Sequence, residues 1–281
     1  MSFTVTTVIA VVEVVGGIFS DSISLMSDAV HMFTDVMAIG LSLFAITIAA
    51  RSHSGAMTFG YHRAEVMAAL ANGIALAIIS VWVLYEAFLR VVSPRIIDAP
   101  LMLLIAAIGL AGNIAVMFML KHQASKSINV HSALVHIVYD TVSSVAVIIS
   151  GFIALNTGMT IVDPLIAFLI AGLVARSAYS IVRSSTHILL EGAPSELDVR
   201  QIIVTLKQLD GVVDVHDLHV WTISTGMDAL SGHVVVRDQL LSQSSKLLSE
   251  INKVLAQRYN ITHTTIQLEH ENKISFSRMI K

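Results

Sequence analysis

The sequence predicts an α-helical, polytopic membrane domain of six transmembrane helices, followed by a C-terminal α+β domain of ferredoxin-like type. Three observations lead to this prediction. The 281-residue chain is 55% hydrophobic and only 13% charged, which is about half the charged share of a typical soluble domain. Long apolar runs recur along residues 1–190. Charge is also uneven: residues 1–190 hold nine acidic and eight basic side chains, whereas residues 191–281 hold eleven and nine.

These differences divide the chain into a membrane domain at residues 1–190, a polar domain at 191–271 and a short tail at 272–281. An apolar run of about 20 residues can cross a bilayer as a helix. The last predicted span is short, and we expect it to continue past Arg176 toward Leu190. The six expected spans are residues 3–19, 25–50, 66–85, 99–120, 132–155 and 161–175.

An even number of spans places both termini on the same side of the membrane. The loops on that side carry four basic residues, whereas the loops on the opposite side carry Arg90 and Arg95. Basic residues are enriched in cytoplasmic loops, so we expect both termini in the cytoplasm. The four basic residues on the side of the termini are Arg51, Arg63, Lys121 and Lys126.

The pattern changes after residue 193. Residues 196–209 and 242–259 show the apolar spacing of amphipathic helices. Residues 212–224 and 227–236 are rich in β-branched side chains and are joined by a glycine-containing turn, and residues 263–270 alternate like a strand. The order α-β-β-α-β fits a two-layer domain of ferredoxin-like type.

Two of the expected spans carry ionisable side chains at helical spacing. The second span holds Asp28, His31 and Asp35, and the fifth span holds His136 and Asp140. Spacings of three and four residues place each set on one face of its helix. An ionisable group inside a membrane costs roughly 2.5–3.5 kcal/mol, so two matched His/Asp pairs indicate a functional site.

Two imidazoles and two carboxylates can form a tetrahedral site that suits Zn²⁺, and also Co²⁺. The chain has no cysteine, so thiolate ligands are excluded. Small residues around Ser143, Ser144 and Ala146 would let the two helices approach closely. For Asp28 two interpretations stay open, a group that orients the ligands and a structural cap.

Several other classes of function are disfavoured. The formal net charge of −3 argues against a nucleic-acid partner. The chain contains no HExxH motif of a metalloprotease and no GxSxG motif of a serine hydrolase, so we expect no enzyme. The remaining alternatives are a transporter of Co²⁺, Mn²⁺ or Fe²⁺ and a membrane sensor that binds metal without moving it.

Several motifs are similar to those of one family of transporters. Besides the two HxxxD pairs, they are TFGYHRAE at 58–65, DP at 163–164, LEG at 190–192 and VHDLHVW at 215–221. With them the chain resembles the cation diffusion facilitators from about Glu13 to Glu269, and specifically their zinc-transporter branch. The resemblance implies a homodimeric antiporter that exchanges cytoplasmic Zn²⁺ for protons. The six spans predict a multi-pass protein among membrane lipids, and the short loops and compact length of the chain indicate a prokaryotic inner membrane.

The resemblance also implies roles for individual residues. It makes His31, Asp35, His136 and Asp140 the ligands of the transported Zn²⁺. It implies a second, regulatory zinc site in the cytoplasmic domain. The ligands of that second site would be His216, His233 and Glu269, with His219 nearby.

Near the membrane surface the resemblance implies a charge pair between Arg63 and Glu191, which in relatives locks the third helix to the sixth across the dimer. Bacterial relatives have a histidine where this chain has Tyr61, which puts a metal site in that loop in doubt. His62 instead matches the zinc-transporter pattern, in which it can join a histidine such as His263 at an interface site.

Overall fold

The computed structural model describes residues 2–49, 57–124 and 128–270, so the expected tail at 272–281 lies outside the described residues. The chain divides into two compact units, Met1–Phe44 with Ala68–Arg183, and Ala45–Met67 with Ser184–Lys281. In chain order the elements are α1 (Ser2–Ser20), α2 (Ile23–Ala49), α3 (Arg63–Val92), α4 (Ala99–Ala124), α5 (Ile128–Thr157), α6 (Val162–Leu189), α7 (Val199–Lys207), β1 (Val212–Ser224), β2 (Met227–Val236), α8 (Leu241–Tyr259) and β3 (His263–His270).

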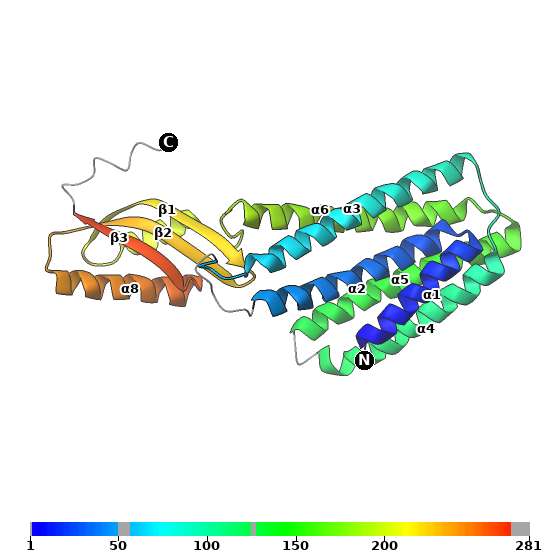
Figure 1. The fold of residues 1–281 in the computed structure, drawn as a ribbon, viewed down its shortest axis with the longest axis horizontal. Coiled ribbons are helices and arrows are strands. Elements are labelled where there is room, and N and C mark those ends of the chain that lie inside the picture. The colour runs from blue at the N-terminus through cyan, green and yellow to red at the C-terminus, as the bar shows by residue number, and fades with distance from the viewer. Residues whose placement is uncertain (1, 50–56, 125–127, 271–281) are drawn as a thin grey trace. The chain divides into compact units, whose positions relative to one another are not determined.

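The described residues of the membrane domain form the six predicted helices, α1 to α6 (Figure 1). By length and composition, α3, α4, α5 and α6 each contain a segment able to cross a membrane, whereas the apolar segment identified in α1 is shorter, Thr6–Ser20. The number of helices in this domain is therefore as predicted, and four of the six are long and apolar enough to cross a membrane.

Close packing between α1 and α4 depends on glycine. A Cβ atom on Gly112 of α4 would lie only 2.2 Å from the Cδ1 atom of Ile9 on α1. Small residues of this kind let two helix backbones approach closely within a membrane. The helix α5 packs on the same α4, so that α1, α4 and α5 form a continuous group beside α2 (Figure 1).

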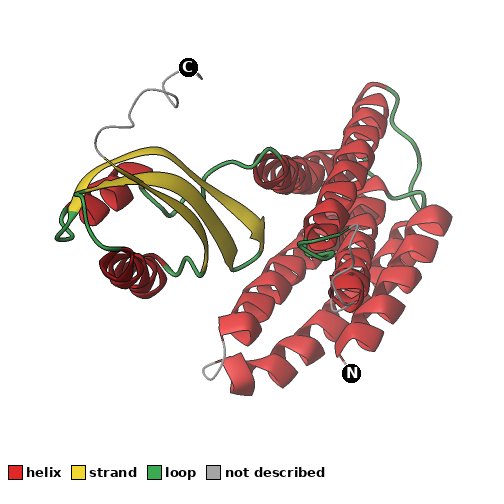
Figure 2. Ribbon diagram, turned by 60° about the vertical axis from the view of Figure 1, so that its left-hand side comes forward, coloured by secondary structure: helices red, strands yellow, loops and turns green. Residues whose placement is uncertain are grey.

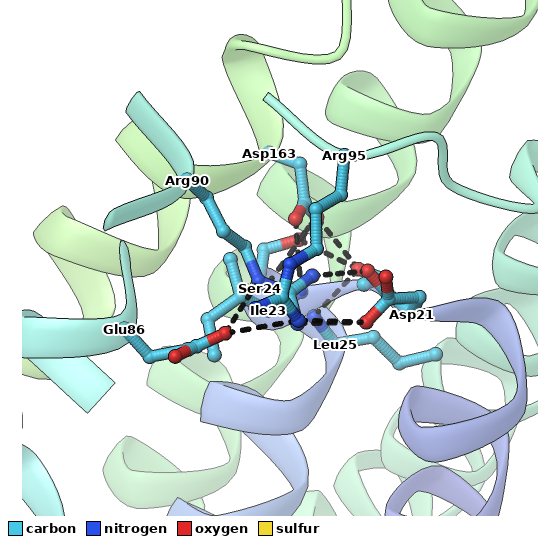
Figure 3. Close-up of polar contacts among 9 residues, drawn as sticks. Asp21, Ile23, Ser24, Leu25, Glu86, Arg90, Arg95 and Asp163 are labelled. Atoms are coloured by element: carbon cyan, nitrogen blue, oxygen red, sulfur yellow. Dashed lines mark hydrogen bonds and ion pairs between the residues drawn. The ribbon is translucent and has the colours of Figure 1, made fainter. Parts of the chain in front are cut away.

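The turn between α1 and α2 is held by a carboxylate from the start of α6 (Figure 3). Asp163 is 1% exposed and accepts hydrogen bonds from the hydroxyl groups of Ser22 and Ser24, both at 2.6 Å. It also accepts from the backbone N–H groups of Ile23 at 2.8 Å and Ser24 at 3.3 Å. Asp163 therefore caps α2, where the first N–H groups of a helix lack partners and favour a negative charge.

Arg90 of α3 reaches the same turn (Figure 3). Its guanidinium group bonds to Asp21 Oδ1 at 2.7 Å and to Glu86 Oε1 at 3.2 Å, and it also donates to the backbone oxygen of Asp21. Arg95 lies 3.3 Å from Glu86. One cluster of polar side chains thus joins the turn between α1 and α2 to the start of α2, the end of α3 and the start of α6.

The C-terminal domain contains a sheet of order β1-β2-β3. The pair β1 and β2 is antiparallel, whereas β3 runs parallel to β2. Because α8 connects these two parallel strands, the order α7-β1-β2-α8-β3 matches a ferredoxin-like βαββαβ unit without its first strand. The α+β prediction is therefore confirmed.

Both helices of this domain pack against one face of the sheet (Figure 2). The largest buried side chains here include Ile202 and Leu206 of α7, Leu230 of β2, and Ile251 and Leu255 of α8. Each is at most 1% exposed, so these apolar faces supply most of the driving force for folding the domain. The histidines of β1 and β2 are left outside this core.

Candidate metal sites

The facing sides of α2 and α5 bring the two predicted His/Asp pairs together. His136 Nε2 lies 3.1 Å from Asp35 Oδ2 and 3.8 Å from Asp140 Oδ2. His31 lies 3.7 Å from Asp35 through Nδ1 and 3.7 Å from Asp140 through Nε2. One ligand atom from each of the four residues can be chosen so that all lie within 4.8 Å of one another.

These separations suit a small tetrahedral cation. Four donors bound to one Zn²⁺ at about 2.0–2.15 Å lie about 3.3–3.5 Å apart. The individual His–Asp contacts here span 3.1–3.8 Å, and one donor atom from each residue can be chosen so that all four lie within 4.8 Å of one another. Nδ1 of His31 and Oδ1 of Asp140 are also buried without a hydrogen-bond partner among the described residues. Buried polar atoms without partners are unfavourable, and a cation at this position would satisfy both.

Asp28 lies one turn before His31 and joins α2 to α5. Its two carboxylate oxygens accept hydrogen bonds from the hydroxyl groups of Ser143 at 2.5 Å and Ser144 at 3.1 Å. Ser144 in turn accepts from Asn113 of α4 at 3.3 Å. We expected these serines to act through their small size, but they also donate hydrogen bonds that fix α2 and α5 beside each other.

A second cluster lies on the sheet of the C-terminal domain. His216 of β1 is directly opposite His233 of β2, and the two rings are 5.2 Å apart. Glu269 of β3 bridges them, with Oε2 3.2 Å from His216 Nε2 and Oε1 2.6 Å from His233 Nδ1. The three predicted residues therefore form one group able to supply three ligands.

Electrostatics favour an ionised carboxylate in this second cluster. The hydrogen bond from His233 lowers the pKa of Glu269, and His216 acts in the same direction. Next to the cluster, Asp217 adopts a positive φ of 51° at an irregular part of β1. Its carboxylate lies 3.1 Å from Nε2 of His219, which places His219 beside the cluster and not in it.

The predicted charge pair is present within one chain: Arg63 Nη2 lies 3.0 Å from Glu191 Oε1. A pocket of about 340 Å³ adjoins this pair, with His62 and Trp221 in its lining. His263 packs edge-on against Phe59, with ring centroids 5.3 Å apart. Among the described residues neither His62 nor His263 joins a cluster of three or more potential ligands, so the interface site stays a prediction.

Reasoning from the sequence missed two features of the membrane domain. The motif at 163–164 was noticed only as part of a resemblance, yet Asp163 caps a helix whose first residues lie 139–141 positions away in the chain. Glu13 was noticed only as a polar residue in an apolar helix, yet it is completely buried. An acidic residue in an apolar run is the only local signal for either role.

Both parts of the chain match known protein families. Residues 1–190 match the family model described as cation efflux transmembrane domain, and residues 194–271 match the one described as cation efflux protein, cytoplasmic domain. The cadmium, cobalt and zinc/H(+)-K(+) antiporter of Bacillus velezensis is 37% identical, over 98% of this chain and 90% of its own length. The zinc transporter ZitB of Escherichia coli is 36% identical, over 96% of this chain and 86% of its own.

Among solved structures, the metal-bound C-terminal domain of the CzcD transporter from Cupriavidus metallidurans is 34% identical. That match covers 26% of this chain and 99% of the other, with a TM-score of 0.24.

Proposed function

This chain belongs to the cation efflux family of multi-pass membrane transporters, and we propose that it exports Zn²⁺ from the cytoplasm in exchange for protons. The transported ion would bind between α2 and α5. Its ligands would be His31, Asp35, His136 and Asp140.

The proposal depends on one observation, the convergence of these four side chains from two helices. Two nitrogen and two oxygen donors, all within 4.8 Å of one another, match the ligand preference of Zn²⁺. Co²⁺ accepts a similar set of ligands, and the Bacillus velezensis relative is named for cadmium, cobalt and zinc. The absence of cysteine from the chain disfavours soft ions such as Cu⁺.

Exchange with protons follows from the chemistry of the ligands. A divalent cation binds neutral imidazole and ionised carboxylate, so its arrival displaces protons and the return of protons displaces the cation. Free histidine titrates near pH 6.5, which makes the competition effective at physiological pH. Alternate opening of the site toward each side of the membrane would then couple the two fluxes.

The C-terminal cluster would act as a sensor of cytoplasmic zinc. His216, His233 and Glu269 offer three ligands at the surface of a domain whose family model is described as cytoplasmic. We propose that the chain functions as a homodimer and that zinc bound here favours one arrangement of the two copies. Such a ligand shifts a conformational equilibrium only as far as its affinities for the two states differ.

The proposed orientation places both termini in the cytoplasm of a prokaryotic cell, within its inner membrane. Arg63 begins α3 and Lys121 lies near the end of α4, whereas Arg90 and Arg95 lie near and just beyond the end of α3; alternating spans would put the first two on the cytoplasmic side and the last two on the other. Arg51 and Lys126 lie outside the described residues. The polar cluster around Asp163 would then close the outer end of the helix bundle.

The direct test is zinc flux into liposomes that contain the purified protein, with internal pH recorded at the same time. We expect Asp35→Ala and Asp140→Ala each to abolish flux, since each removes one of four ligands. Glu250→Ala, on the exposed face of α8, is the control and should transport normally. Full flux in either site variant would refute the four-ligand site, and zinc binding without flux in the wild-type protein would indicate a sensor instead.

A further inference from the structure

Glu13 is the only ionisable residue of α1, and the proposed four-ligand site does not use it. Its exposed fraction is 0%. Neither Oε1 nor Oε2 has a hydrogen-bond partner among the described residues. A buried carboxylate without donors is among the most unfavourable groups in a membrane domain, so the presence of this one requires a role.

The neighbouring helix leaves space for this carboxyl group. A Cβ atom at Gly109 of α4 would lie 1.8 Å from Glu13 Oε1 and 2.9 Å from its Cδ. Any side chain other than hydrogen at position 109 would therefore collide with the carboxyl group. The nearby Gly112 faces the aliphatic side chain of Ile9 instead.

The charged groups that face Glu13 are acidic. They are Asp28 of α2 and Asp140 of α5, while on α4 the carboxyl group lies beside Gly109. The negative charge of Asp28 is stabilised by two serine hydroxyl groups, but within the described part of the chain no such donor reaches Glu13. An ionised Glu13 would thus be repelled by two carboxylates without solvation, and a proton removes both penalties.

We propose that Glu13 is a proton-binding site of the membrane domain, separate from the four candidate metal ligands. It holds a proton before a divalent cation binds between α2 and α5, and it releases that proton when the cation arrives. The two positive charges of the cation offset the carboxylate of Asp140, so the repulsion that favoured the protonated acid is lost. The acid becomes a carboxylate, and the proton leaves to the aqueous side that is open at that moment.

This inference rests on the proposed metal–proton exchange. It states that some of the exchanged protons bind to Glu13, which lies outside the metal site. Its test is the number of protons released per Zn²⁺ bound. Calorimetric titration of the full-length protein in detergent, in buffers of different ionisation enthalpy at one pH, measures that number. The key variant is Glu13→Gln, which keeps the shape of the side chain but cannot ionise.

We expect Glu13→Gln to bind Zn²⁺ and to release fewer protons per ion than the wild-type protein, by up to about one. Zinc bound at the C-terminal cluster contributes equally to both proteins and cancels in the difference. The control is the same chemical change at an exposed position, Glu250→Gln, which should leave proton release unchanged. Equal proton release by Glu13→Gln and the wild-type protein, with zinc binding intact, would overturn the inference.

If Glu13→Gln does not fold, a second variant provides the same test. The double change Glu13→Ala with Gly109→Ala removes the carboxyl group and fills part of its space with a methyl group. It should show the same deficit in released protons. If instead the wild-type protein and Asp35→Ala bound equal amounts of zinc, the proposed function itself would fail, and this inference with it.

Discussion

The carboxylate of Asp163, at the start of α6, accepts two hydrogen bonds from Ser24, at the start of α2: one from its hydroxyl group at 2.6 Å and one from its backbone N–H at 3.3 Å. The same helix α2 carries His31 and Asp35 two to three turns further on. The cap therefore fixes one end of the helix that supplies half of the proposed metal ligands.

Replacing Asp163 by alanine should destabilise the membrane domain by on the order of 3 kcal/mol, because buried hydroxyl and N–H donors would lose their acceptor. The measurement is thermal unfolding in detergent followed by circular dichroism. Asp98→Ala is the matched control, since Asp98 is an exposed residue that accepts one hydrogen bond, from the N–H of Leu101 at 3.0 Å. Equal losses of stability in the two variants would contradict the role of Asp163.

Arg90 and Arg95 should differ sharply in their effect on stability. The side chain of Arg90 is 10% exposed and bonds to Asp21 and Glu86, whereas that of Arg95 is 52% exposed. Arg90→Ala would remove the bonds to the carboxylate and the backbone oxygen of Asp21 and one of the two cations beside Glu86, which keeps Arg95 at 3.3 Å, at a cost of about 2–3 kcal/mol. Arg95→Ala should cost at most about 1 kcal/mol. Chemical denaturation of both variants tests this order, and similar midpoints would refute it.

The ion pair between Lys207 and Asp214 predicts a dependence of stability on pH. Lys207 Nζ lies 2.6 Å from Asp214 Oδ1, and its hydrogen bond lowers the pKa of Asp214. A carboxyl group whose pKa is lower in the folded state adds stability above its unfolded pKa and loses it as the pH falls through the folded value. Both side chains are about half exposed, so the gain is only about 0.2–1 kcal/mol.

In Lys207→Gln, the free energy of unfolding of the C-terminal domain should therefore fall less between about pH 5 and about pH 3 than it does with Lys207 present. The fluorescence of Trp221 reports unfolding of this domain once the other tryptophan is removed by Trp82→Phe. An acid dependence identical to that of the same background without Lys207→Gln would show that the pair contributes nothing.

His216→Ala should separate regulation from transport. Loss of one of three clustered ligands should weaken zinc binding to the C-terminal domain by one to several orders of magnitude. Basal zinc flux in liposomes should persist, while its activation by rising zinc on the cytoplasmic side should be reduced. Complete loss of flux would mean that the cluster belongs to the transport path.

Much of the fold was predictable because hydropathy and spacing are local signals. The structural bounds of α6, Val162–Leu189, agree with the expected continuation of the last span past Arg176. Helix α3 begins at Arg63 and ends at Val92, several residues beyond each end of the apolar run. Apolar composition identifies the part of a helix that lipid can surround, whereas hydrogen bonding continues into the polar flanks.

The four candidate ligands were predictable for the same reason, because each pair is four residues apart on one helix. The contacts of Asp28 and Asp163 were not, since their partners lie 115–141 residues away. Such contacts depend on which helix faces which, and that choice is made by tertiary packing. The contact between Gly109 and the carboxyl group of Glu13 also depends on tertiary packing and was not predictable from local sequence.

The most direct test of the account is anomalous diffraction at the zinc absorption edge from crystals grown with Zn²⁺. We predict a peak between α2 and α5, about 2.0–2.2 Å from one donor atom of each of His31, Asp35, His136 and Asp140. Zinc found only at the C-terminal cluster, with these four side chains pointing into separate surroundings, would contradict the account.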